Sequence, residues 1–403
     1  MNFETTERTL QLIDRLNNFM AEHIYPLEKE YEKYVFNNLW QEHPALEELK
    51  VKAKNAGLWN LFLPKEYGHI SPGLTNLEYA PLAEQMGRIL WSSKVFNCTA
   101  PDTGNMEVLA KFGSDSQKNQ WLTPLLDGNI RSAFLMTEPQ VASSDATNIE
   151  TSIVKDADHY VINGHKWWST GAMHPNCKVF IVMGKTAPNA ERYIQQSMII
   201  VPKDTPGVEI VRPLQVFGNL HSPDGHCEIK LTNVRISKEN LILGEGRGFE
   251  IAQGRLGPGR IHHCMRLIGC AQRALELMCT RVTQRTTFGN ELSSYSSIRQ
   301  DIAKSRCEIE QARLLTLSAA DKIDKEGIKG AKDLIAMIKI VCPRMAAQVI
   351  DRAVQAFGGM GVCQDTPLPD MWSYARFIRL ADGPDEVHEY QLGRNTIKKY
   401  RLQ

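Results

Sequence analysis

The first 130 residues carry apolar side chains at helical spacing, separated by short polar breaks. One such stripe is formed by Leu10, Ile13, Leu16 and Met20, which indicates an amphipathic helix. Residues 46–58 and 77–90 have the same pattern, and Pro81 is expected to fit only near the start of the second helix. The pattern predicts an N-terminal helical domain over residues 1–130.

The period of the pattern changes between residues 131 and 240. Residues 179–183 and 197–201 are short apolar runs of strand length. Residues 161–164 follow a turn-forming segment at 156–158, which predicts a hairpin or a pair of turns. This stretch predicts a small β domain inserted between two helical regions.

Residues 241–403 return to helical spacing. One helix face is kept by Leu334, Met337, Ile338, Val341 and Met345. Pro343 is expected to kink or break that helix, because proline lacks a backbone N–H. Long helices joined by short connections predict an antiparallel bundle. The chain is therefore predicted to be a multi-domain α+β protein with an α-helical domain, a middle β domain and a C-terminal helical bundle.

Composition and charge narrow the functional classes. The chain has 403 residues, of which 42% are hydrophobic and 23% charged, and this ordinary globular balance excludes wholesale disorder. The 47 basic and 46 acidic residues give a formal net charge of +1, so no broad positive field indicates a nucleic acid or an anionic membrane as partner. No apolar run reaches the roughly 18 residues of a membrane-spanning helix. The acidic, polar start predicts neither a secretory signal nor a transit peptide.

The nine cysteines are scattered without the paired spacing of a metal site. They are typical of small buried hydrophobic residues in a reducing compartment, so we predict a cytoplasmic protein with free thiols. His262 and His263 are adjacent, and His388 stands alone among acids. No metal site is predicted from this pattern.

Two clusters in the middle region could bind a polar ligand. Residues 134–145 (FLMTEPQVASSD) can present hydroxyl and backbone N–H groups to a polar ring or a phosphate, and a capped turn before a strand is the alternative. Residues 166–170 (KWWST) combine a flat apolar surface with two hydroxyl groups. The alternative for this cluster is that both tryptophans belong to the core.

Three further clusters lie in the C-terminal region. Residues 355–361 (QAFGGMG) would let a backbone approach a phosphate, although the spacing is not that of a Rossmann fingerprint and a glycine-capped helix end is the alternative. Residues 285–289 (RTTFG) by themselves are typical of a surface turn. Asp382 precedes a Gly-Pro turn, so its carboxylate is expected on a loop, where it could act as a base or join a solvated helix-capping cluster.

The order and spacing of these clusters together are specific. TEP…SSD, KWWST, RTTFG, QAFGGMG and ADGP follow one another as in the acyl-CoA dehydrogenase family, which the chain resembles along essentially its whole length. The ADGPDEVH ending and the extended TEPQVASSD loop are most similar to the branch whose animal members carry an added kinase-like domain, a domain that this chain is expected to lack. The resemblance implies an α domain, a β domain and a C-terminal four-helix bundle.

The resemblance also implies FAD as cofactor. Matched by position, the flavin would be contacted by Phe134, Met136, Thr137, Ser143, Trp168, Ser169, Thr170, Pro384 and Glu386. Contacts across a subunit interface would come from Arg285, Phe288, Gln355, Gly358 and Gly359. A homodimer or a homotetramer is therefore implied. The chain departs from many relatives at Ser296, where they have a flavin-contacting Gln.

The implied substrate is an acyl-CoA thioester. Its CoA part would contact Ser144, Gly257 and Arg260, and Gly383 would border the thioester. Asp382 stands where most of the family has a Glu as base, and it is shorter by one methylene, about 1.5 Å. A misplacement of about 1 Å can lower a rate on the order of 100-fold, so the backbone must come closer or the chemistry differs. Some branches carry their Glu at the position of Gly259, so no rival base stands there.

The implied activity is that of an oxidoreductase of fatty acid metabolism. Asp382 would remove the α-proton while the flavin accepts a hydride from the next carbon, and the backbone N–H of the base residue would help to stabilise the enolate oxygen. An electron-transfer flavoprotein is the implied electron acceptor. Two alternatives stay open: an oxygen-reactive oxidase similar to nitroalkane oxidase or acyl-CoA oxidase, and a catalytically silent acyl-CoA-binding subunit.

Overall fold

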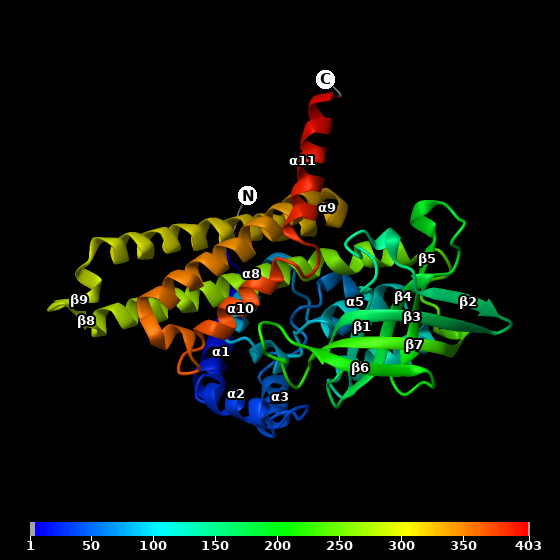
Figure 1. The fold of residues 1–403 in the computed structure, drawn as a ribbon, viewed down its shortest axis with the longest axis horizontal. Coiled ribbons are helices and arrows are strands. Elements are labelled where there is room, and N and C mark those ends of the chain that lie inside the picture. Colours follow the sequence, from blue (N-terminus) through cyan, green and yellow to red (C-terminus); the bar gives the residue numbers. More distant parts are fainter. Residues whose placement is uncertain (1–4, 402–403) are drawn as a thin grey trace. The chain divides into compact units, whose positions relative to one another are not determined.

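The computed structural model describes residues 5–401 (Figure 1). The chain divides into two compact units. The helical unit comprises Met1–Tyr25, Leu74–Ser93 and Gly257–Gln403, and the mixed unit comprises Pro26–Gly73 and Lys94–Leu256. Within residues 5–401, none of the helices is both long and apolar enough to cross a membrane.

A seven-stranded sheet forms the centre of the mixed unit. Its order is β1-β4-β2-β3-β7-β6, and β5 is added by pairing with β4. The strands are β1 (Arg131–Leu135), β2 (Ser152–Asp156), β3 (His159–Thr170), β4 (Cys177–Lys185), β5 (Gln196–Pro202), β6 (Val208–Leu214) and β7 (His226–Ser237). β1 runs parallel to β4, whereas β3 is antiparallel to both β2 and β7. The strands predicted at 179–183 and 197–201 and the hairpin after 156–158 are confirmed.

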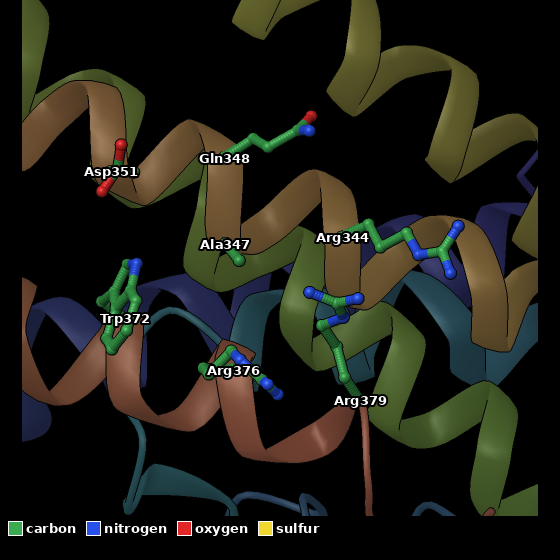
Figure 2. Close-up of a pocket in the computed structure, with 7 residues that line it drawn as sticks. All are labelled: Arg344, Ala347, Gln348, Asp351, Trp372, Arg376 and Arg379. Atoms are coloured by element: carbon green, nitrogen blue, oxygen red, sulfur yellow. The ribbon is translucent and has the colours of Figure 1, made fainter. Parts of the chain in front are cut away.

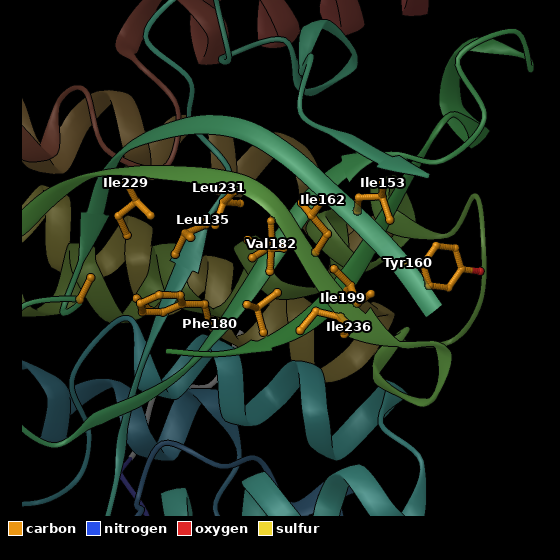
Figure 3. Packing of buried hydrophobic residues seen from close by; sticks show 14 of the residues in the cluster. Leu135, Ile153, Tyr160, Ile162, Phe180, Val182, Ile199, Ile229, Leu231 and Ile236 are labelled. Atoms are coloured by element: carbon orange, nitrogen blue, oxygen red, sulfur yellow. The ribbon is translucent and has the colours of Figure 1, made fainter. Parts of the chain in front are cut away.

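Alternating apolar residues fix the register of this sheet (Figure 3). Tyr160 and Ile162 from β3 and Phe180 and Val182 from β4 are at most 3% exposed and belong to one buried cluster. A slip of one residue would turn Ile162 to the other face of the sheet. The same register determines where the far end of β3, with its predicted ligand-binding residues, lies.

Short helices accompany the sheet in the mixed unit. They are α2 (Glu28–Asn37), α3 (Ala45–Asn55), α5 (Asp102–Phe112), α6 (Asp115–Gln117), the π-helix η4 (Lys118–Leu122), α7 (Thr123–Leu126) and the 3-10 helices η2 (Lys65–Ile70), η5 (Ala146–Asn148), η6 (Arg192–Ile194) and η7 (Lys238–Asn240). Helix α3 confirms the helix predicted over residues 46–58. The buried carboxylate of Asp102 on α5 pairs with Arg131 and accepts the backbone N–H of Ser132 at 2.7 Å, which ties α5 to β1.

The helical unit is dominated by long helices (Figure 1). Its elements are α1 (Glu7–Phe19), the π-helix η1 (Met20–Ile24), α4 (Asn76–Met86), most of α8 (Gly248–Gln284), the hairpin β8 (Thr286–Thr287) and β9 (Asn290–Glu291), η8 (Leu292–Ser294), α9 (Ser296–Phe357), η9 (Gly358–Val362), α10 (Leu368–Ile378) and α11 (Asp385–Arg401). The short 3-10 helix η3 (Ser92–Lys94) follows α4.

Helix α9 consists of two antiparallel limbs. Its backbone leaves helical dihedrals at Gly327, whose φ of 69° suits glycine. Residues on either side of this point then meet in pairs: Arg352 Nη1 lies 2.6 Å from Glu308 Oε2, and the sulfur of Cys342 lies 3.3 Å from the hydroxyl of Thr316. The chain therefore reverses at Gly327.

Two expectations about proline were wrong. The second limb of α9 continues through the buried Pro343 to Phe357 instead of breaking there. Pro81 lies in the interior of α4 rather than near its start. Each proline removes one backbone hydrogen bond. Most helical stability comes from tertiary packing, and both helices keep buried faces on either side of the proline.

Helix α8 runs parallel to the second limb of α9. The sulfur of Cys264 lies 3.5 Å from the carbonyl of Ile338, and further along both helices the guanidinium of Arg281 lies 5.4 Å from the centroid of the Phe357 ring. The offset in residue number is nearly constant between these contacts. The C-terminal ends of both helices therefore lie at the same end of the helical unit.

Glycines allow α4 and α8 to cross at very close range. A Cβ on Gly269 would lie 1.9 Å from the backbone oxygen of Glu84, and one on Gly87 would lie 2.2 Å from the backbone oxygen of Arg266. A backbone atom cannot move aside as a flexible side chain can. The crossing therefore requires glycine at both positions.

Gly269→Ala should lower the free energy of unfolding by about 3 kcal/mol or more, because the added methyl group overlaps backbone. Gly393→Ala on α11 is the matched control, since no described heavy atom lies within 4 Å of its added Cβ. That control should be neutral or stabilising by up to about 1 kcal/mol, as alanine favours a helix. Denaturant unfolding measures both variants, and equal stabilities would contradict the close crossing.

Candidate functional site

A buried ion pair anchors the loop after β1. Glu138 in this loop and Lys166 on β3 are 4% and 0% exposed, and Nζ lies 2.8 Å from Oε1. The carboxylate also accepts the backbone N–H groups of Glu150 at 2.7 Å and Thr151 at 2.9 Å. Burial alone would raise the pKa of Glu138, but Lys166 and these hydrogen bonds hold the pKa below its usual range.

Lys166 also holds the backbone on both sides of it. Its ammonium donates to the carbonyl oxygens of Met136 at 2.9 Å and Met183 at 2.7 Å. Burial lowers the pKa of Lys166 to about 8, and the nearby charge of Glu138 opposes this shift. The ammonium thereby fixes the segment that carries the predicted residues Met136 and Thr137.

The two predicted serines of this loop differ in their surroundings. Ser143 is buried, and its hydroxyl accepts the backbone N–H of Glu138 at 2.8 Å, so it braces the turn of the loop itself. Ser144 is exposed. The loop therefore presents Ser144, but not the hydroxyl of Ser143, on its surface.

The end of β3 carries an irregularity at the paired tryptophans. The ladder with β7 shifts between Lys166 and Ser169, and Trp168 adopts a left-handed backbone with φ of 53°. The backbone N–H of Trp167 donates to the carbonyl of Thr137 at 3.0 Å, which joins this irregularity to the loop after β1. The ring of Trp168 is left 42% exposed. The structure thus brings both predicted clusters of the middle region together.

Two buried polar groups at this irregularity have no hydrogen-bond partner among the described residues. They are the hydroxyl of Ser169 and the indole N–H of Trp167. Buried polar groups in folded proteins are normally paired. A polar heterocycle lying against this segment would supply partners, so the residues present fit the flavin that the resemblance implies.

A pair of histidines sets the orientation of the Thr170 hydroxyl. Thr170 Oγ1 lies 2.8 Å from Nδ1 of His226, whose Nε2 lies 2.9 Å from Nδ1 of His221. Burial lowers the pKa of His226 to about 4, and His221 adds to the shift. The His226 ring is therefore neutral near pH 7 and restricts how Thr170 can turn.

The ring of Phe134 on β1 is held by a cation. The guanidinium of Arg255 lies 4.0 Å from its centroid, and Nε of Arg255 donates to Asn105 at 3.4 Å. Glu107 shares these surroundings, and burial raises its pKa to about 8 although the charge of Arg255 opposes the shift. Phe134 therefore has a fixed ring orientation beside a buried polar group.

In the helical unit, Asp382 lies on the loop between α10 and α11. Its backbone is left-handed with φ of 55°, which is uncommon outside glycine, and its side chain is 24% exposed. Arg260 on α8 donates from Nε to the carbonyl oxygen of Asp382 at 3.2 Å. Burial lowers the pKa of Arg260, and the Asp382 carboxylate opposes this shift. The predicted substrate residue Arg260 thus supports the backbone of the predicted base.

Two further side chains hold the same loop. Lys339 is 1% exposed and donates to the carbonyl oxygens of Ile378 at 2.7 Å and Ala381 at 2.8 Å. His388 donates from Nε2 to the carbonyl of Asp382 at 3.3 Å. Burial lowers the pKa of His388 to about 4, and the cations Arg260 and Lys339 add to the shift, so His388 is a neutral donor near pH 7.

The start of α11 fixes the other end of the Asp382 loop. The buried carboxylate of Asp385 accepts hydrogen bonds from Arg344 at 2.9 Å and Arg379 at 2.8 Å. Gly383 has φ of 100°, and an added Cβ would lie 2.8 Å from Nε2 of His388, so glycine is required there. Pro384 is half-buried and Glu386 is exposed beside these groups.

His263 is a neighbour of Asp382 that the sequence motifs did not predict. Its Nε2 lies 3.4 Å from Asp382 Oδ2. Because His263 follows Arg260 by three residues, both lie on one face of α8, and this spacing was a signal available in the sequence. The buried Gly257 precedes them by one turn. These residues and Asp382 form one group at the N-terminal end of this part of α8.

The predicted cross-subunit residues form a second group at the other end of the helical unit. Arg285 and Phe288 follow α8, and Gln355, Gly358 and Gly359 end the parallel limb of α9. At 1.5 Å per residue, about 36 Å of helix separates Arg260 from the end of α8. Phe288 is fully exposed, and no described atom lies within 4 Å of a Cβ added to either glycine. The two groups therefore lie at opposite ends of this part of α8.

A groove of about 430 Å³ lies between the second limb of α9 and α10 (Figure 2). It is lined by Arg344, Ala347, Gln348, Asp351, Trp372, Arg376 and Arg379. None of the predicted site residues lines it. Arg344 and Arg379 donate to Asp385, so the groove lies next to the hydrogen bonds that hold the end of the Asp382 loop.

Lys166→Met should lower the free energy of unfolding by about 3–5 kcal/mol, because Glu138 is left as a buried charge without its partner. Lys178→Met on β4 is the matched control, since Lys178 is exposed and the change should stay within about 0.5 kcal/mol. Denaturant unfolding of both variants measures the difference. A Lys166→Met protein as stable as the control would contradict the anchoring role of the pair.

Three family models match the chain in succession. They are described as acyl-CoA dehydrogenase, N-terminal domain, over residues 6–129; middle domain, over residues 133–234; and C-terminal domain, over residues 246–397. Together they account for most of the chain.

Three curated relatives share more than half of their aligned residues with the chain. Mouse acyl-CoA dehydrogenase family member 10 is 55% identical over 395 residues, which cover 96% of this chain and 37% of that protein. Human acyl-CoA dehydrogenase family member 11 is 53% identical, covering 96% of this chain and 50% of that protein. The chain thus spans about a third to a half of these vertebrate proteins. The probable acyl-CoA dehydrogenase FadE2 of Mycobacterium tuberculosis is 53% identical over 99% of this chain and 98% of its own length.

Solved structures share the fold over nearly the whole chain. A candidate acyl-CoA dehydrogenase from Mycobacterium abscessus has a TM-score of 0.96 and 50% identity, covering 98% of this chain and 100% of its own. Butyryl-CoA dehydrogenase from Megasphaera elsdenii has a TM-score of 0.83 and 26% identity, with coverages of 98% and 100%. The predicted fold class of N-terminal helical, middle β and C-terminal helical domains is confirmed. The chain belongs to the acyl-CoA dehydrogenase family, in the branch that includes family members 10 and 11.

Proposed function

We propose that this protein binds FAD and oxidises an acyl-CoA thioester between its α- and β-carbons, with Asp382 as the base. The observation that carries the proposal is the support of Asp382: its backbone is held by Arg260 and His388, while its side chain stays 24% exposed. A base needs a fixed position and access to its substrate. The Asp382 loop provides both.

FAD would be held mainly by residues of the mixed unit. The proposed contacts are Phe134, Met136, Thr137, Ser143, Trp168, Ser169 and Thr170, with Pro384 and Glu386 in the helical unit. The buried and unpaired hydroxyl of Ser169 supports this assignment among the residues described. PigA, which was solved with FAD and proline, shares the fold with a TM-score of 0.85 at 22% identity. The flavin, when bound, supplies the acceptor for a hydride.

The chain's own residues would activate the α-proton. Arg260 and Lys339 place two positive charges near the Asp382 carboxylate, and the ionised carboxylate is the form that can take a proton. The fixed backbone of the loop keeps the N–H of Asp382 in a constant direction, as a donor to a developing enolate oxygen must be. The carboxylate would then receive the proton from the α-carbon.

The acyl-CoA would be bound by Ser144, Gly257, Arg260 and Gly383. Ser144 is exposed on its loop, and Gly383 adjoins the proposed base. Arg260 would have two roles. Its Nε donates to the carbonyl of Asp382, and the residue would also contact the substrate.

A second copy of the chain would complete each flavin site. The exposed Phe288 and Arg285 and the open glycines Gly358 and Gly359 lie about 36 Å of helix away from Arg260. We therefore propose a homodimer or a homotetramer in which Arg285, Phe288 and Gln355 contact the partner's FAD. An electron-transfer flavoprotein is the proposed acceptor. The solved electron transferring flavoprotein of Acidaminococcus fermentans contains a chain that matches this one with a TM-score of 0.81 and 26% identity.

Asp382→Asn should bind FAD normally and lose about 10²–10⁴-fold in the rate of flavin reduction by acyl-CoA, because the amide cannot accept the α-proton. Anaerobic mixing of the purified yellow protein with a series of acyl-CoAs, followed by flavin absorbance, measures this rate. Bleaching at the wild-type rate in Asp382→Asn would remove Asp382 from the role of base.

The same experiment separates the alternatives. An Asp base is also used by nitroalkane oxidase, so bleaching by nitroalkanes together with rapid reoxidation by oxygen would favour an oxidase. Purification of the wild-type protein without flavin would favour a silent acyl-CoA-binding subunit. Bleaching by an acyl-CoA with slow reoxidation by oxygen is the result that the proposed function predicts.

A further inference from the structure

We propose that His263 is a positioning residue for the base: its Nε2–H holds one carboxylate oxygen of Asp382 and thereby sets the direction of this short side chain. The proposal rests on the proposed function, since it takes Asp382 as the base. Its starting point is the distance of 3.4 Å between His263 Nε2 and Asp382 Oδ2.

A neighbouring arginine determines which ring nitrogen of His263 carries the proton. Nη2 of Arg266 lies 3.2 Å from Nδ1 of His263. A guanidinium has donors and no acceptor, so Nδ1 of His263 must accept and is unprotonated. The ring proton then resides on Nε2, the nitrogen that faces Asp382. Arg266, His263 and Asp382 thus form a directed chain of donors ending at the carboxylate.

The spacing along α8 makes this chain possible. Arg260, His263 and Arg266 follow one another at intervals of three residues and lie on one face of the helix. His263 is partly buried, with 16% of its side chain exposed, so water competes weakly for its Nε2–H. In this row Arg260 supports the backbone of Asp382, His263 donates to its carboxylate, and Arg266 orients the His263 ring.

Arg260 and Lys339 place positive charge near the Asp382 carboxylate, while the following hydrogen bonds from the neighbouring groups go to other atoms. Arg260 from α8 and His388 from α11 donate to the carbonyl oxygen of Asp382. Lys339 from α9 donates to the carbonyl oxygens of Ile378 and Ala381, and Asp385 is engaged by Arg344 and Arg379. These contacts fix the backbone of the loop, whereas His263 reaches the side chain.

An aspartate has particular need of such a contact. With its backbone fixed, the carboxylate of Asp382 still has the staggered χ1 positions and rotation about χ2 open to it. The Asp carboxylate also lies one methylene closer to the backbone than that of the Glu usual in this family. The shorter side chain therefore cannot bring the carboxylate back to the substrate from a wrong rotamer. A neutral donor at one oxygen selects the direction of the carboxylate. A distance of 3.4 Å is long for a hydrogen bond, so the contact guides the carboxylate without removing its basicity.

Two substitutions at His263 separate the donor from the bulk of the ring. His263→Leu removes the donor at similar size, and His263→Gln keeps an N–H at comparable reach. His263→Leu should lower the rate constant of flavin reduction by acyl-CoA about 10- to 100-fold, because the base is misdirected. The Kd for acyl-CoA should change by less than about threefold, since binding is the same before the proton moves. His263→Gln should restore most of the rate.

The holoenzyme provides a second readout without any substitution. Nitrogen-15 NMR of histidine-labelled protein reports the tautomer of each ring, and we expect His263 to carry its proton on Nε2 in the wild type. In Asp382→Asn, the Nε2 signal of His263 should shift, because its acceptor changes from a carboxylate to an amide. A resting proton on Nδ1 would overturn the proposal even if His263→Leu failed to fold.

The outcomes distinguish this proposal from the function on which it rests. If Asp382→Asn is inactive while His263→Leu reduces flavin at the wild-type rate, the role of His263 is wrong and the role of Asp382 stands. If His263→Gln is as slow as His263→Leu, the ring acts by its shape and the donor role is wrong. If Asp382→Asn retains the wild-type rate, both assignments fall together.

Discussion

The chemistry proposed for the helical unit depends on how the backbone around Asp382 is held. Lys339 is almost fully buried, and burying its ammonium group costs free energy. Its hydrogen bonds to the carbonyl oxygens of Ile378 and Ala381 offset this cost. Arg260 and His388 hold the carbonyl of Asp382 itself. These contacts maintain a left-handed aspartate, a conformation that costs on the order of 1–3 kcal/mol and persists only when the surroundings determine it. The position of the proposed base is thereby set by its backbone.

The two units support their loops in the same physical way. In the mixed unit the buried Lys166 donates to the carbonyl oxygens of Met136 and Met183 and pairs with Glu138, and so fixes the loop after β1. In the helical unit Lys339 does the same for the loop before α11. A lysine reaches two carbonyls of a loop at once because it has three donors on a long stem. Loops that carry candidate ligands thus gain the rigidity of the elements that bear the lysines.

Much of the fold could be predicted from local pattern, and the site only in part. The strands at 179–183 and 197–201, the hairpin after Asp156 and helix α3 follow from apolar spacing, and the order of the motifs identified the family. Pro343 was misjudged because the local cost of a proline is smaller than the packing of a long buried helix face. The sequence did not reveal that Lys339 and His388 support the Asp382 loop. Both side chains donate to backbone carbonyl oxygens, and Lys339 is also distant from them in sequence, so no side-chain pattern indicates these contacts. The boundaries near residues 130 and 240, the flavin contacts and the cytoplasmic location remain predictions.

The proposed role of Asp382 is tested most directly by a structure of the flavin-loaded protein with an unreactive acyl-CoA analogue. In that structure we expect one carboxylate oxygen of Asp382 about 3–3.5 Å from the α-carbon of the analogue, the separation of a near-attack geometry. We also expect the isoalloxazine ring on the opposite side of the same carbons. An Asp382 carboxylate turned away from the thioester, or a flavin position filled by the protein's own side chains, would contradict the proposed role.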